Sequence, residues 1–134
     1  MRKILLSLMC VLCMIGTVKS QAFLGEKKEL ILSKIKYKIQ THNKSTDKTE
    51  AVSYFDDKED CFKMYWFRDS ICVGYTLSST NDYVLSYIKR INETYIKSGT
   101  NKWVDEEGEV MVDLIINKAK GMFTINIKYI ENEE

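Results

Sequence analysis

The chain has 134 residues, with 20 Lys and Arg against 19 Asp and Glu, and it contains no proline. A net charge of +1 gives no sustained basic surface, so we expect no nucleic acid as a partner. With 45% hydrophobic residues, the length fits one domain that buries a single core without metals or several disulfides.

The N-terminal segment has the pattern of a cleavable export signal. Arg2 and Lys3 precede an apolar run over residues 4–16, and small residues follow at 18–22. The run is shorter than the ~20 residues that a helix needs to cross a hydrocarbon core, so we expect no permanent membrane anchor.

Cleavage is expected near Ser20 or Ala22, because either choice puts small residues where a signal peptidase reads them. We therefore predict a signal peptide over residues 1–20 and a single exported α+β domain over 21–134, either periplasmic or secreted. Removal of the signal peptide would leave 17 basic and 19 acidic residues, a net charge of −2.

The first half of the mature chain reads as one helix followed by strands. Apolar residues at helical spacing predict a helix over 25–39, and a polar loop is expected over 41–49. This loop holds His42, the only histidine, so no second imidazole is present for a metal site or catalytic pair. Segments rich in β-branched and aromatic residues predict strands over 51–55, 62–68 and 71–77.

The second half repeats this order. Val84, Tyr87, Ile88 and Ile91 follow helical spacing, and Gly99 is expected to end that helix. Alternating apolar and polar residues then predict three further strands. These strands are expected over residues 102–105, 109–117 and 122–130.

These elements predict an α+β fold in which two helix-plus-three-strand units form one antiparallel sheet of about six strands. Both helices are expected on one face of the sheet. The order of elements resembles the helix-plus-sheet repeats of the β-lactamase inhibitor protein and of outer-membrane assembly lipoprotein modules. The resemblance is architectural, transfers no site residue, and implies the role of an exported, non-catalytic binding module.

The two cysteines of the mature chain, Cys61 and Cys72, would reach an oxidising compartment, where thiols often pair. A hairpin turning at residues 69–70 would place Cys72 opposite Phe67, roughly 20 Å along the strand from Cys61. That separation exceeds the ~7 Å limit for a disulfide. Two alternatives remain for this pair: a disulfide, which would require a different pairing of the two strands, or two buried free thiols.

Two acidic turns, at residues 56–60 and 105–109, carry enough carboxylates to raise the alternative of a small envelope-glycan hydrolase. Neither turn has the alternating ligands and closing glutamate of a calcium loop. We predict no catalytic residue, metal or cofactor, and interpret both turns as solvated hairpin tips.

Aromatic residues concentrate in the predicted strands in greater number than one sheet face would bury. A sheet with helices on one side leaves the other face open, and Tyr and Trp are enriched at interfaces. We therefore predict a non-enzymatic protein that binds another protein or an envelope component through an exposed aromatic sheet face; the further alternative is a structural envelope-assembly or stress component. The candidate binding face comprises Tyr65, Trp66, Phe67, Tyr75 and Trp103.

Overall fold

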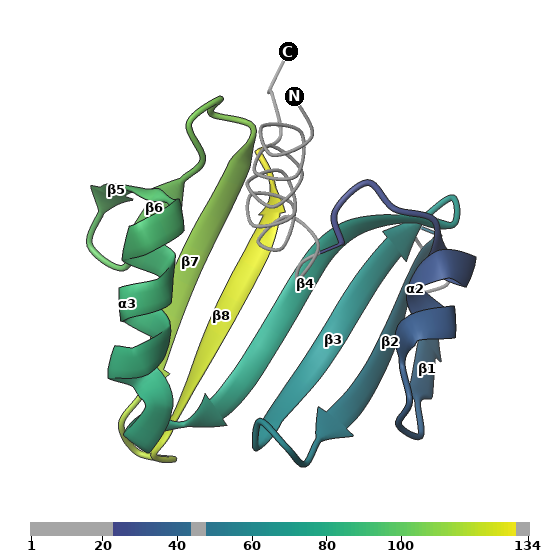
Figure 1. Ribbon diagram of the computed structural model, residues 1–134, viewed down its shortest axis with the longest axis horizontal. Helices are drawn as coiled ribbons and strands as arrows, with labels where there is room; N and C mark the ends of the chain where they lie inside the picture. The colour runs from purple at the N-terminus through teal and green to yellow at the C-terminus, as the bar shows by residue number, and fades with distance from the viewer. Residues whose placement is uncertain (1–22, 44–47, 131–134) are drawn as a thin grey trace, which may run out of the picture.

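The computed structural model describes residues 23–43 and 48–130 (Figure 1). The predicted signal peptide, both of its cleavage sites and residues 44–47 lie outside the described residues. The first half comprises α2 (Lys28–Lys34), β1 (Gln40–Asn43), β2 (Thr49–Asp56), β3 (Cys61–Arg68) and β4 (Ile71–Thr80). The second comprises η1 (Asn81–Tyr83), α3 (Val84–Thr94), β5 (Ile96–Gly99), β6 (Lys102–Val104), β7 (Val110–Asn117) and β8 (Met122–Tyr129).

The described strands form one eight-stranded antiparallel sheet in the order β1-β2-β3-β4-β8-β7-β6-β5. Each half of the chain is a helix followed by four strands, and the halves join where β4 pairs with β8. The predicted sheet of about six strands, built from two helix-plus-three-strand units, is therefore wrong. The prediction missed β1 and β5, the two outermost strands of the sheet.

Both missed strands are four residues long and lack the apolar alternation of a half-buried strand. Strand β1 has the sequence QTHN, and all four residues of β5 are exposed. They exist because a neighbour offers backbone hydrogen-bonding groups: Gln40 pairs with Ser53 of β2, and Ile96 pairs with Val104 of β6. Neighbouring strands, rather than local propensity, determine these two edges.

The first helix is also shorter than the predicted segment 25–39. It ends at Lys34, and Ile35 is already extended with φ −84° and ψ 119°. Beyond it, Ile35 and Tyr37 pack against the core while Lys36 and Lys38 are exposed, which is the alternation of an extended chain. Tyr37 is held there by Tyr54, whose ring lies 5.6 Å away in a stacked arrangement.

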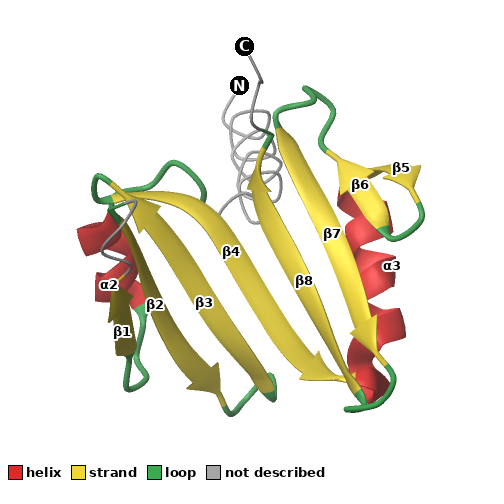
Figure 2. Ribbon diagram, turned by 180° about the vertical axis from the view of Figure 1, so that it is seen from behind, coloured by secondary structure: helices red, strands yellow, loops and turns green. Residues whose placement is uncertain are grey.

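The two helices lie on the same side of the sheet, with α2 near the β1–β2 end and α3 near the β6–β7 end (Figure 1). Seen from behind, both helices lie beyond the strands (Figure 2). Ile31 of α2 and Ile91 of α3 are buried against this side of the sheet. The middle of the sheet, near the β4–β8 pair, lies between the two helices.

The β3–β4 hairpin has the predicted register. Cys72 pairs with Phe67, and the turn residues Asp69 and Ser70 adopt φ of 52° and 63°. Both residues therefore occupy the left-handed region that two-residue hairpin turns require. Val73 has no partner in β3, and this bulge puts Cys72 and Tyr75 on the same buried face.

Candidate functional site

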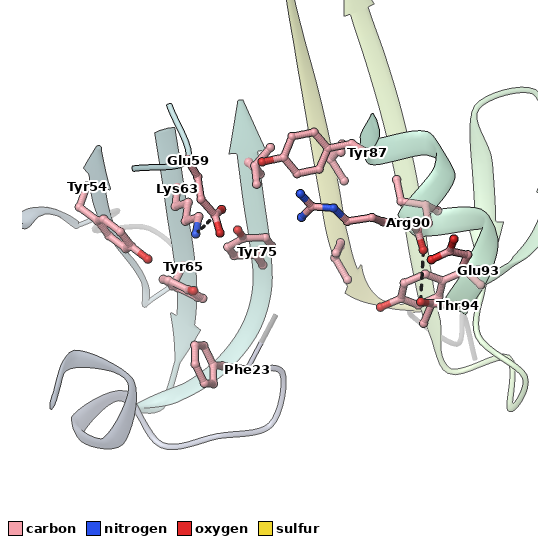
Figure 3. A pocket seen from close by; sticks show the side chains of 15 residues that line it. Phe23, Tyr54, Glu59, Lys63, Tyr65, Tyr75, Tyr87, Arg90, Glu93 and Thr94 are labelled. Atoms are coloured by element: carbon pink, nitrogen blue, oxygen red, sulfur yellow. Dashed lines mark hydrogen bonds and ion pairs between the residues drawn. The ribbon is translucent and has the colours of Figure 1, made fainter. Parts of the chain in front are cut away.

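A pocket of about 480 Å³ lies on the helix-bearing side, between the two halves of the chain (Figure 3). Its size falls within the range of roughly 300–1,000 Å³ that is usual for small-molecule sites. One wall comes from β2, β3 and β4, the opposite wall comes from α3, and β8 adds Ile125 and Ile127.

Three tyrosines on neighbouring strands form the first wall. Tyr65 of β3 pairs directly with Tyr75 of β4, and their ring centroids are 5.0 Å apart. Tyr54 of β2 continues the row, 6.3 Å from Tyr65. Phe23, which precedes α2, packs at 5.7 Å against Tyr65. Because side chains alternate along a strand, the register brings these rings onto one face.

The phenols of this wall are held in their neutral form. Burial raises the pKa of Tyr65 and Tyr75 well above the ordinary value of 10.0, with smaller contributions from neighbouring groups. Burial also raises the pKa of Tyr54, although Lys63 opposes that effect. A neutral phenol both donates and accepts a hydrogen bond, so this wall is polar without carrying charge.

Lys63 is the cation of this wall, and two carboxylates neutralise it. Its Nζ lies 3.2 Å from Asp56 Oδ2 and 3.0 Å from Glu59 Oε2. Burial opposes the charge, but hydrogen bonds and ion pairs with Glu59 and Asp56 outweigh it and raise the pKa of Lys63 above its usual range. The ammonium therefore stays charged within a cluster that compensates it.

Asp56 holds this cluster together. Its Oδ1 accepts hydrogen bonds from the backbone N–H of Lys58 and of Glu59 and from the hydroxyl of Tyr37. Burial favours the neutral acid, yet the Glu59 N–H, Lys63 and Tyr37 outweigh it and lower the pKa of Asp56. Asp56, at the start of the first acidic turn, is thus buried and ion-paired, whereas residues 57–60 are exposed, as expected for a solvated hairpin tip.

The opposite wall comes from α3 and the residue that follows it. Tyr87 and Arg90 are one helical turn apart and lie on the same side, with Arg90 Cζ 4.9 Å from the Tyr87 ring centroid. Tyr87 also packs against Phe123 of β8 at 5.4 Å. Burial is the main cause that raises the pKa of Tyr87 to about 12 and also raises that of Tyr95. This wall combines two neutral phenols with one guanidinium.

The structure divides the predicted aromatic face between the two sides of the sheet. Tyr65, Phe67, Tyr75 and Trp103 lie on the helix-bearing side and are almost fully buried. Only Trp66 points to the opposite side, which carries neither of the described helices, and its Nε1 donates to Thr76 Oγ1 at 3.1 Å. The five residues therefore do not form one exposed surface, because Trp66 alternates with its neighbours along β3.

Two of these five residues nevertheless meet at a site, since Tyr65 and Tyr75 line the pocket. Phe67 and Trp103 belong to the core, and Trp103 Nε1 donates to Asn92 Oδ1 of α3 at 2.8 Å. The sequence interpretation did not select Lys63, Tyr87, Arg90 or Tyr95. The spacing of Tyr87 and Arg90 put them on one helix face, but no sequence signal showed that this face meets Tyr75.

The other residues considered from the sequence, Cys61, Cys72, His42 and the second acidic turn, do not line the pocket. Cys61 and Cys72 are buried free thiols, and burial raises the pKa of both, that of Cys72 to about 11. His42 lies on edge strand β1 instead of in a loop, with Nε2 3.2 Å from Ser53 Oγ. The second acidic turn supplies no lining residue to the pocket. Within 23–43 and 48–130, no three His, Cys, Asp or Glu side chains gather as metal ligands would.

No family model, curated protein or solved structure matches this chain. The architectural resemblance noted from the sequence therefore gains no support from these comparisons. Among the described helices, none is long and apolar enough to span a bilayer.

Proposed function

We propose that this is an exported, non-enzymatic binding protein whose ligand site is the tyrosine-lined pocket. One observation carries the proposal: five tyrosines from β2, β3, β4 and α3, including Tyr95 just after that helix, converge on one 480 Å³ cavity. Aromatic and aliphatic walls with a few placed polar groups are typical of binding sites. Export is supported by the N-terminal sequence pattern, and the ligand would be an envelope component or a molecule outside the cytoplasm.

The hydrolase alternative finds little support in this pocket. Glu59, from the first acidic turn, is engaged with Lys63 at 3.0 Å, and the second acidic turn lies elsewhere. Glu93 lines the pocket from α3. Glycoside cleavage requires two carboxyl groups that face the scissile bond, whereas Glu59 is already paired with Lys63.

A bulky side chain placed in the pocket tests the proposal. Thr94 lines the pocket from the last turn of α3 and is exposed, so Thr94→Trp should obstruct the cavity without disturbing the core. Leu85→Trp is the matched control, because Leu85 is on the same helix, is 77% exposed and lines no part of the pocket. Nile red, a neutral fluorescent probe for apolar sites, would report binding.

We expect Nile red to bind wild type and Leu85→Trp equally, and Thr94→Trp at least about tenfold more weakly, since the aromatic ring fills space that the probe needs. Equal binding by all three proteins would reject the pocket as the ligand site. Mass measurement of the protein recovered outside the cytoplasm tests export separately. An N-terminus just after Ser20 or Ala22 is the expected result, and an intact Met1 would contradict it.

The side of the sheet opposite the described helices gives a second candidate, namely binding of a protein through exposed and half-buried aromatic residues. Phe55 is 53% exposed, and Phe62, Met64 and Trp66 follow on the neighbouring strand on the same side. Large exposed apolar area favours interfaces. Recovery of envelope proteins with immobilised wild type and Phe55→Ser would test it, and identical recoveries would remove this second candidate.

A further inference from the structure

Arg90 brings a positive charge to the wall of the pocket that α3 forms. In Figure 3 its guanidinium points from α3 into the space between the two walls. The ion pairs among the described residues are Lys28–Glu50 and those of Lys63 with Asp56 and Glu59. Arg90 therefore has no carboxylate partner in that part of the chain, although it lies over the Tyr87 ring.

The two cations of the pocket differ in what they can offer a ligand. Lys63 already has two carboxylates within 3.2 Å, so a ligand anion would have to displace one of them. Arg90 needs no such displacement, and its planar fork of N–H donors can bind a carboxylate or phosphate through two hydrogen bonds at once. Arg90 is exposed, and its guanidinium lies 4.9 Å from the Tyr87 ring centroid, a contact that favours this orientation.

Apolar side chains lie on the sheet between the cation-bearing walls. Leu77 of β4 pairs with Ile125 of β8, and Tyr75 pairs with Ile127 in the same ladder. All four line the pocket, at the point where the halves of the chain meet. This floor has no charged group, so the part of a ligand that it covers should be apolar.

We propose that the pocket binds an amphipathic anion, with Arg90 holding the anionic end and the Leu77, Ile125 and Ile127 floor holding an alkyl or aryl body. The inference rests on the proposed function, because it assigns a ligand class to the same pocket. The phenols of Tyr75 and Tyr87 line the same pocket and add polar groups without charge. Glu93 lines the pocket as well and opposes an anion, so it should limit affinity.

Calorimetric titration with three probes of equal chain length tests the assignment: decanoate and decyl phosphate, each kept below its micelle concentration, and neutral decanol, kept below its solubility limit. We expect both anions to bind wild type about tenfold more tightly than decanol, and Arg90→Gln to remove that advantage. Tighter binding of decyl phosphate would assign a phosphate headgroup, and tighter binding of decanoate a free carboxylate. Glu93→Gln should strengthen anion binding about twofold.

Lys89→Gln is the matched control, because it removes one positive charge from the neighbouring exposed position of α3 without touching the pocket. If Lys89→Gln and Arg90→Gln lose the same amount of affinity for the anionic probes, the anion assignment is wrong. Equal affinity of wild type for decanol and decanoate would also contradict the anion assignment. Neither result would argue against the pocket as the binding site. Absence of binding by every decyl probe would also overturn the anion assignment. Undiminished decanoate and Nile red binding by Thr94→Trp would instead reject the pocket itself.

Discussion

The two halves of the chain have the same order of elements but carry different side chains. Each consists of a helix followed by a four-strand meander, and each places its helix over the outer part of its own strands. The first half contributes a row of tyrosines and the Lys63 charge cluster, whereas β7 and β8 contribute mainly Val, Leu and Ile. The pocket requires both halves, because it lies where β4 meets β8.

The helices are attached differently as well. Neither helix has a side-chain N-cap. Seven-residue α2 is tied to the β3–β4 hairpin through its backbone, with Lys28 N–H donating to the Ser70 carbonyl at 2.8 Å. Eleven-residue α3 buries Ile91 and accepts the Trp103 hydrogen bond through Asn92. An isolated helix of either length is marginal in water, so these tertiary attachments decide whether each helix forms.

The largest expected effect comes from removing the attachment in the second half. Trp103→Ala should destabilise the protein by about 3–5 kcal/mol, because it leaves a cavity beneath α3 and leaves Asn92 without its donor. Denaturant unfolding measures this loss. Leu85→Ala, on the exposed side of the same helix, should change stability by less than about 0.5 kcal/mol. A loss of under 1 kcal/mol in Trp103→Ala would contradict the role of Trp103 as the anchor of α3.

A second test compares the aspartates in equivalent turns of the two halves. Asp56 and Asp105 each accept two backbone N–H hydrogen bonds, but only Asp56 also binds Lys63 and Tyr37. Asp56→Asn should therefore cost about 2 kcal/mol, and Asp105→Asn less than about 1 kcal/mol, in unfolding free energy. Equal losses would show that the Lys63 cluster adds nothing to the first half.

The same pair of variants gives a pH test. Because the folded protein lowers the pKa of Asp56 from 3.8, the contribution of Asp56 is present above that value and is lost as pH falls through the folded pKa. Wild type and Asp105→Asn should lose this part of their stability below about pH 4. Asp56→Asn should lack it. Parallel pH profiles for all three proteins would contradict the assignment.

The smallest effect is expected at the cysteines, where no loss of stability is involved. Both thiols are buried and have raised pKa values, so native protein should react with a thiol reagent only as fast as it opens. Unfolding should make the thiols of Cys61 and Cys72 reactive. A protein that is two hydrogens lighter than its sequence mass, measured without reductant, would instead indicate a disulfide.

The sequence identified those elements whose own periodicity matches their burial. Strand β8 alternates Phe123, Ile125 and Ile127 toward the core, and Tyr87 and Ile91 of α3 have helical spacing. These patterns were sufficient to predict both elements. Each element buries only one side, so its buried apolar residues recur along the sequence with the period of a strand or a helix. The hairpin at residues 69–70 followed from turn chemistry and the strand patterns beside it.

Only tertiary structure determined the sheet edges, the end of α2 and the pocket. Strands β1 and β5 have no apolar pattern, and residues 35–39 fit either a helix or an extended chain until Tyr37 meets Tyr54 and Asp56. The pocket joins Tyr75 to Arg90 through a sheet order in which β4 pairs with a strand more than forty residues later. The periodicity of a sequence predicts which face of an element is buried. Which residues that face contacts depends on the topology of the sheet.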